Sequence, residues 1–182
     1  NYGLVKKDLN NVIDEVEIIS SRALIEQVIK DLKFNIQYFV EGRIQKREVY
    51  VNPPLKLNFS ASDSVLFRVD TTMNVKIHSE TQFLLKGITD KEKFWKSKNQ
   101  NIEDQGTLYS FGQAIKTGFG DIIITPNIGQ YAAKPGATIT VKISPIHKII
   151  GSYKGSLLIE TKEFSSIIKL SVTDNNRNKA TV

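Results

Sequence analysis

Residues 14–50 have the sequence DEVEIISSRALIEQVIKDLKFNIQYFVEGRIQKREVY, and this stretch decides the fold because its hydrophobic period changes halfway along. Helical spacing begins upstream and covers about residues 8–33, where apolar side chains recur every three or four positions. Ser20 or Ser21 can cap a second helical stretch, since a serine hydroxyl accepts hydrogen bonds from the free amides of a first turn. The pattern predicts helix up to Lys33, and leaves open whether this is one bent helix or two.

After Asn35 the apolar residues occupy every second position, which is typical of a β-strand. Residues 36–41 form the first predicted strand, and Gly42 provides a turn or bulge. Residues 43–51 form the next strand. The Asn-Pro-Pro sequence at 52–54 ends it, because proline offers no amide hydrogen to a neighbouring strand.

The rest of the chain alternates short apolar segments with turn residues. Residues 96–105 form an exposed polar loop, and Gly118 and Gly120 suggest a hairpin. Pro145 suits the first turn of a helix that ends at Gly151 or Gly155. Alternation predicts strands at residues 55–60, 65–70, 75–78, 83–86, 121–125 and 139–144, and a closing strand pair at 157–161 and 166–172.

Composition describes an ordinary globular chain. The 182 residues are 40% hydrophobic and 24% charged, with a net charge of +6 and no cysteine. The lysines are scattered, so we expect no nucleic-acid partner. No apolar run approaches the roughly 20 residues that span a bilayer, and no signal-peptide pattern is present. Because the chain begins at Asn1, we expect it to be a fragment of a longer protein.

The sequence carries no pattern that specifies a reaction. His78 and His147 have no second histidine at a metal-ligand spacing, so we predict no metal site. Thr117–Asp121 contains two glycines but lacks the lysine of a phosphate-binding loop, which indicates a turn. Phe94-Trp95 among lysines suits either a sugar-stacking surface or core packing. We therefore predict no catalytic residue and no cofactor.

Two segments at opposite ends of the chain resemble a known family. The first is EVEIISSR at 15–22, followed by a helix, YFVEGR at 38–43 and REVY at 47–50; the second covers residues 144–160, 167–172 and 180. Together they cover about half the chain and resemble the periplasmic domain of Wzz/Wzc-type polysaccharide co-polymerases, of the Bacteroidetes-like exopolysaccharide transport type. Ser20 stands where that family usually has lysine, and Phe39 replaces a tyrosine.

The resemblance implies an α+β fold. Helices would pack on a mixed sheet formed by the two ends of the chain, 1–51 and 144–182, and residues 52–143 would form a β-rich, sandwich-like insertion. All 182 residues would then belong to a single periplasmic domain fragment. Two transmembrane helices would flank this domain in an inner-membrane protein, and many relatives carry a cytoplasmic tyrosine autokinase domain whose nucleotide motifs are not in this chain.

The resemblance also implies a function without a reaction. We expect ring assembly that regulates chain length and export of exopolysaccharide or capsule, in contact with the polysaccharide polymerase and the export machinery. The polysaccharide itself is a further candidate partner. The alternative is a secreted β-rich carbohydrate-binding module. Opposite charges on neighbouring subunits suggest a candidate interface at Glu15, Glu17, Arg22, Glu26, Lys30, Arg43 and Arg47.

Overall fold

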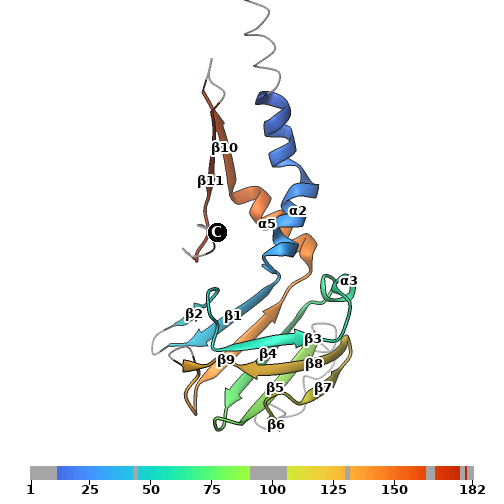
Figure 1. The fold of residues 1–182 in the computed structure, drawn as a ribbon, viewed down its shortest axis with the longest axis vertical. Helices are drawn as coiled ribbons and strands as arrows, with labels where there is room; N and C mark the ends of the chain where they lie inside the picture. The colour runs from blue at the N-terminus through green and yellow to red at the C-terminus, as the bar shows by residue number, and fades with distance from the viewer. Residues whose placement is uncertain are drawn as a thin grey trace, which may run out of the picture. The chain divides into compact units, whose positions relative to one another are not determined.

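The computed structural model describes residues 12–42, 45–90, 106–129, 132–162, 167–176 and 179. The chain is α+β and divides into two compact units (Figure 1). The end unit contains the described residues up to Phe34 and from Ile146 onward. The β unit extends from Asn35 to Pro145. The segments at the two ends of the chain therefore fold together, while the middle of the chain folds on itself.

The end unit begins with helical residues 12–20 and continues in α2 (Arg22–Asp31). Ser21 separates them with an extended backbone, φ −63° and ψ 141°, and its hydroxyl accepts a hydrogen bond from the Leu24 amide at 3.2 Å. The open question of one helix or two is thus resolved as two helical stretches, because the capped residue leaves the helical conformation.

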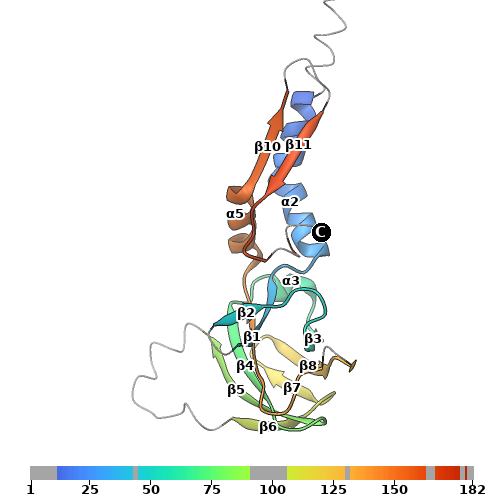
Figure 2. The ribbon, with the colours of Figure 1, turned by 90° about the vertical axis from the view of Figure 1, so that its left-hand side faces the viewer.

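Helix α5 (Ile146–Ser156) packs against α2 within the end unit. Ile25 and Ile29 of α2 and Ile150 of α5 are buried. The rings of Phe34 and Tyr153 stack with centroids 5.1 Å apart. Strands β10 (Leu157–Thr161) and β11 (Ile168–Val172) form a separate antiparallel pair (Figure 2). The predicted closing strand pair is confirmed.

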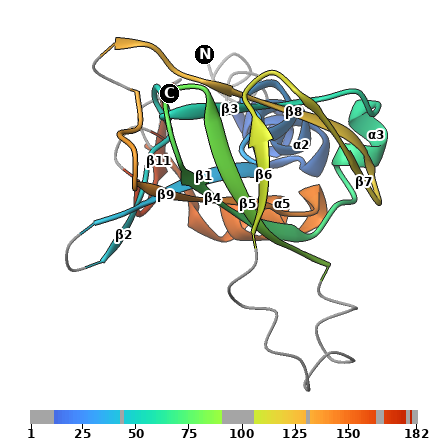
Figure 3. The same ribbon diagram turned by 90° about the horizontal axis from the view of Figure 1, so that it is seen from below.

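The β unit consists of two antiparallel sheets. A six-stranded sheet has the order β2-β1-β9-β4-β5-β6, and a three-stranded sheet has the order β3-β8-β7. Figure 3 shows β3 and β8 on one side of the unit and β1, β9 and β4 on the other. The strands are β1 (Ile36–Glu41), β2 (Lys46–Glu48), β3 (Leu55–Phe59), β4 (Thr71–Ile77), β5 (Gln82–Asp90), β6 (Thr107–Ser110), β7 (Ala114–Thr117), β8 (Gly120–Pro126) and β9 (Thr138–Ile143).

Alternate residues of both sheets meet in one hydrophobic core. In the six-stranded sheet Met73, Val75, Ile139 and Val141 are fully buried. The three-stranded sheet contributes Leu55, Leu57, Ile115, Ile122 and Ile124 to the same cluster. Because residues two apart point to the same face of a strand, this period of two buries one face of each sheet and leaves the other polar.

The expected mixed sheet formed by both chain ends is wrong. The described strand pairings are all antiparallel, and β1 pairs with β9, with Tyr38 opposite Val141. Strands β10 and β11 pair with each other in their own sheet. The apolar residues of β1 and of its neighbour β9 lie on the same face of the six-stranded sheet. Strands β10 and β11 are close in sequence, so their pairing closes a short loop at low entropic cost. Residues 35–51 consequently lie in the β unit.

Two local predictions also fail. Residues 65–70 do not form a strand, because α3 (Asp63–Leu66) occupies this position, burying Leu66 and exposing Val65. Ser62 and Asp63 suit a helix start, and a short apolar run fits either period. Helix α5 continues through Gly151 and Gly155 to Ser156. Sequence alone also missed β6 and β7. The predicted loop at 96–105 lies outside the described residues.

The β7–β8 hairpin depends on Gly120, which has a φ of +117°. A Cβ atom at this position would lie 2.9 Å from the Cβ of Ala61. Gly118 in the same turn has open space within 4 Å and no positive φ. The predicted turn at Thr117–Asp121 is confirmed, and its two glycines have unequal roles.

We expect Gly120→Ala to lower the free energy of unfolding by about 1–3 kcal/mol, the usual cost of a non-glycine residue in strained backbone. Gly118→Ala, the matched control, should change it by less than ~0.5 kcal/mol. Urea denaturation followed by circular dichroism measures both. Equal effects of the two substitutions would contradict this account.

Tyr38 connects the two sheets of the β unit. Its hydroxyl accepts a hydrogen bond from the Leu57 amide of β3 at 3.1 Å. Strand β3 is an edge of the three-stranded sheet, so this amide points away from its neighbour β8. Burial raises the pKa of Tyr38, and the amide hydrogen bond opposes that rise only in part.

Tyr38→Phe should destabilise the protein by about 1–3 kcal/mol, because it leaves the amide of the buried Leu57 without an acceptor. Tyr109→Phe is the matched control, since the Tyr109 hydroxyl makes no hydrogen bond to the described residues. In urea denaturation at pH 8, the Tyr109→Phe protein should have nearly the same free energy of unfolding as the parent. A Tyr38→Phe protein as stable as the parent would show that this hydrogen bond contributes nothing.

The raised pKa of Tyr38 also predicts a pH dependence. Below about pH 10 the hydroxyl is protonated in both states. Above it the unfolded chain loses this proton first, so the stability that Tyr38 contributes falls as pH rises through the folded-state pKa. The stability difference between the parent and Tyr38→Phe should narrow between pH 8 and pH 11. A constant or widening difference would argue against a buried neutral phenol.

Candidate functional site

The predicted interface residues are divided between the two units. Glu15 and Glu17 are exposed on the helix at 12–20, and Arg22 is exposed at the start of α2. Arg47 is exposed on β2 of the β unit. Arg43 lies outside the described residues.

Glu26 and Lys30 are the two candidate residues that the structure brings into direct contact. The Lys30 Nζ and Glu26 Oε1 atoms are 2.6 Å apart across one helical turn. The hydrogen bond from Lys30 and its positive charge lower the pKa of the Glu26 carboxyl. Such exposed pairs contribute little to stability because water screens them. The pair satisfies its own charges within one chain, so it has less to offer a neighbouring subunit than Glu15, Glu17 or Arg22.

The end unit exposes apolar side chains that sequence reasoning did not single out. Ile13 and Ile18 on the first helix are 56% and 62% exposed. In the β10–β11 pair, the register places Ile159 opposite Leu170, and Leu170 is 52% exposed. The sequence feature that could have indicated this exposed apolar surface is the continuous apolar run at 157–159. It lacks the alternation of a strand with one solvent-facing side. We call Ile13, Ile18, Leu158, Ile167 and Leu170 the exposed apolar set of the end unit.

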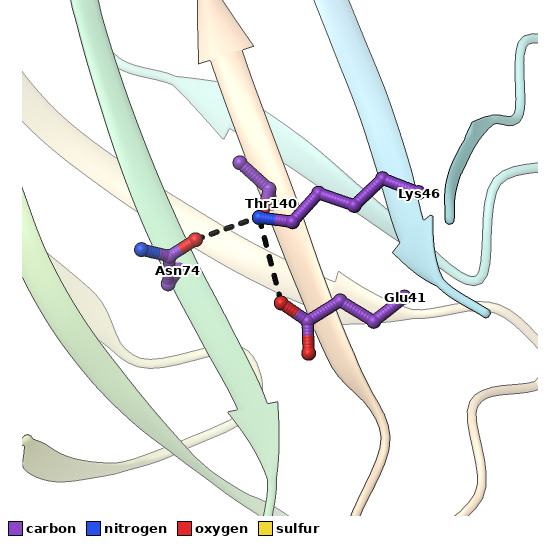
Figure 4. Close-up of polar contacts among 4 residues, drawn as sticks. All are labelled: Glu41, Lys46, Asn74 and Thr140. Atoms are coloured by element: carbon purple, nitrogen blue, oxygen red, sulfur yellow. Dashed lines mark hydrogen bonds and ion pairs between the residues drawn. The ribbon is translucent and has the colours of Figure 1, made fainter. Parts of the chain in front are cut away.

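A chain of polar contacts crosses the outer face of the six-stranded sheet (Figure 4). Lys46 Nζ lies 3.4 Å from Glu41 Oε1 and donates a hydrogen bond to Thr140 Oγ1 at 3.3 Å. The Thr140 hydroxyl in turn donates to Asn74 Oδ1 at 2.8 Å. The hydroxyl thus accepts from a cation and donates to an amide, which uses both of its capacities. This network connects β2, β1, β9 and β4. Its polar groups already have partners within the sheet.

The inner side of the same sheet ends in an open hollow of about 520 Å³. Val40 of β1 lies opposite Arg47 of β2 and opposite Ile139 of β9, so these three side chains share the core-facing side. The segment before β9 forms another wall. The lining is mainly aliphatic, with a cation on each of two walls, and consists of Val40, Gly42, Arg47, Val49, Asn52, Pro54, Ala132, Ala133, Lys134, Ala137 and Ile139.

Other candidate residues stay isolated. His78 and His147 are exposed, as is Asp14. Among the described residues no group of three or more histidine, cysteine, aspartate or glutamate side chains is placed to hold a metal ion. Phe94-Trp95 lies outside the described residues. The described geometry therefore offers surfaces and one hollow as candidate sites.

Comparison with known proteins gave no family assignment. No protein-family model matches the sequence, and a search of curated proteins found no significant match. Within the described residues, none of the helices combines the length and apolar character that crossing a membrane requires.

Proposed function

We propose that this chain is the periplasmic region of an inner-membrane polysaccharide co-polymerase. In this role it regulates chain length and export of exopolysaccharide or capsule through ring assembly, and it catalyses no reaction of its own. The observation that carries the proposal is that the helical part of the first segment that resembles this family folds with the second segment, whereas residues 38–43 and 47–50 of the first lie in the β unit. Residues 12–34 and 146–176, far apart in the sequence, belong to one compact unit.

Specific contacts within the end unit support a functional association of these segments. Besides the ring stacking of Phe34 on Tyr153, the Tyr153 hydroxyl donates a hydrogen bond to Asp174 Oδ2 at 2.7 Å. Lys179 Nζ lies 5.5 Å from the centroid of the Phe34 ring. These contacts tie both ends of the chain together. An arrangement of this kind suits a domain held between two membrane anchors, because both anchors then continue from one unit.

The surface of the end unit is suited to assembly. Ile13 and Ile18 of its exposed apolar set share the helix at 12–20 with the exposed Glu15 and Glu17. Apolar contact supplies most of the free energy of association, and charges at the rim select the partner and its register. Anchoring in a membrane raises the effective concentration of neighbouring subunits, so contacts that are weak singly suffice for a ring. The partners are further copies of the chain, the polymerase and the export machinery.

The carbohydrate-binding alternative has less support. Sugar sites in proteins commonly use an aromatic ring as a stacking platform. None of the described residues that line the hollow is aromatic, and Phe94-Trp95, on which this alternative depends, lies outside the described residues.

Deletion of the full-length gene should broaden or shift the length distribution of the exported polysaccharide on gel electrophoresis. When the gene is reintroduced with the double substitution Glu15→Lys/Glu17→Lys, export should be restored only in part. The reversed charges oppose contact between subunits. Lys116→Glu, on exposed β7 of the other unit, is the matched control and should restore it fully. Unchanged polymer in the deletion strain would refute the proposed function. Full rescue by the double reversal would exclude only this surface.

A further inference from the structure

The hollow at the β2 end of the β unit has an aliphatic floor that continues the hydrophobic core. Val40, Ala133 and Ala137 line it and also pack against the core cluster. Its volume of about 520 Å³ is within the range of roughly 300–1,000 Å³ that small-molecule sites occupy. Aliphatic surface in such a hollow gains free energy when an apolar ligand displaces water from it.

Two cationic side chains line the same hollow from separate elements. Arg47 comes from edge strand β2, on its core-facing side, and Lys134 comes from the segment that leads into β9. Neither side chain makes an ion pair or hydrogen bond with another described residue. The described lining contains no acidic residue. Two unneutralised cations beside an aliphatic floor are complementary to a molecule with an apolar body and an anionic head.

We infer that this hollow binds an alkyl phosphate monoester. The alkyl chain would lie on Val40, Ala133 and Ala137, and the phosphate would contact Arg47 and Lys134. A phosphate monoester is favoured over a carboxylate because it carries about −1.5 to −2 charges at neutral pH, which match two cations. The guanidinium of Arg47 also presents paired donors that fit phosphate oxygens. This inference stands independently of the proposed co-polymerase function.

Asn52 adds a polar group to the same wall. Its backbone is left-handed, with φ +51°, which asparagine tolerates better than most residues. Asn52 is one of the residues that line the hollow, and a side-chain amide in this position could donate to a phosphate oxygen that the cations leave unpaired.

A purely structural reading assigns the two cations a different role. A charged residue on the inward side of an edge strand discourages pairing with another chain, and long cationic stems cover apolar surface. The edge-strand role applies to Arg47 on β2 but not to Lys134, which is not on a strand, whereas coverage of the aliphatic floor by a cationic stem applies to both. The purely structural reading predicts no saturable ligand binding, so the two readings are separable by titration.

The test is titration of the purified chain with monodecyl phosphate, below the concentration at which it aggregates. Calorimetry measures affinity, and amide shifts in ¹H–¹⁵N NMR locate the site. We expect saturable one-to-one binding with shifts at Val49, Ala133 and Ala137. Decanoate should bind about tenfold more weakly, and the neutral-headed decyl maltoside about a hundredfold more weakly, as each lost charge-assisted contact is worth about 1.5–3 kcal/mol. Inorganic phosphate alone should not saturate the site.

Variants distinguish charge recognition from general apolar binding. Arg47→Gln and Lys134→Gln should each weaken monodecyl phosphate about tenfold. Lys76→Gln, an exposed cation on the outer face of the same sheet, is the matched control and should leave affinity unchanged. Ala132→Trp should block the hollow and abolish binding. All four positions tested are exposed, so the fold should persist, which circular dichroism checks.

Several results would overturn the inference. These are absence of saturable binding, equal affinity for the phosphate and maltoside heads, and equal losses in Lys76→Gln and Arg47→Gln. Shifts confined to the exposed apolar set of the end unit would place the ligand elsewhere. Tighter binding of an acidic oligosaccharide than of monodecyl phosphate would assign the cations to a sugar ligand instead.

Discussion

The antiparallel pairing of β1 with β9 is the constraint on which the rest of the structure depends. It joins residues about a hundred positions apart, with Ile36 opposite Ile143 and Val40 opposite Ile139. The Ser144 amide then donates a hydrogen bond to the Asn35 carbonyl at 2.9 Å. The chain therefore enters and leaves the β unit side by side. Residues before Asn35 and after Pro145 consequently start close together, which favours the folding of the two chain ends as one unit.

This long-range pairing also explains where the sequence was informative and where it was not. Alternation identified β1, β3, β4 and β9 because each buries one face in the shared core. It did not reveal that β1 belongs with β9, since many strands offer an apolar face of the same period and only the assembled register selects among them. A cap at Ser20 or Ser21 was suggested by the sequence because its cause is local, but the break between two helical stretches at Ser21 is decided only by the structure. The short apolar run at α3 has too few residues to distinguish the two periods.

The candidate sites also differ in whether their cause is local in the sequence or depends on long-range strand pairing. Exposure of Glu15, Glu17 and Arg22 was predictable, because charged residues on a helix face are rarely buried. Arg47 was predicted as a surface charge, but its place on the core-facing side of β2 depends on how the turn after β1 sets the register. The hollow combines residues from four separate segments, so no local pattern in the sequence marks it. A site of this kind becomes visible only when the strand pairing is known.

The two units differ in how completely they bury their own apolar surface. The described residues of the β unit include fifteen buried hydrophobic side chains in one cluster. Among the described residues, the end unit has five buried hydrophobic side chains, which are Val12, Ile25, Ile29, Phe34 and Ile150. It also includes a two-stranded sheet, an element that is marginally stable by itself in water.

A unit with so small a core gains more from a partner than the β unit does. Whatever covers Ile18, Leu158 or Leu170 binds the folded state alone and so raises its stability by mass action. If the chain assembles through the end unit as proposed, this assembly and the folding of the unit are thermodynamically linked. The β unit buries its apolar residues in a core of its own. The end unit is therefore the part of the chain in which association and folding would respond to the same conditions.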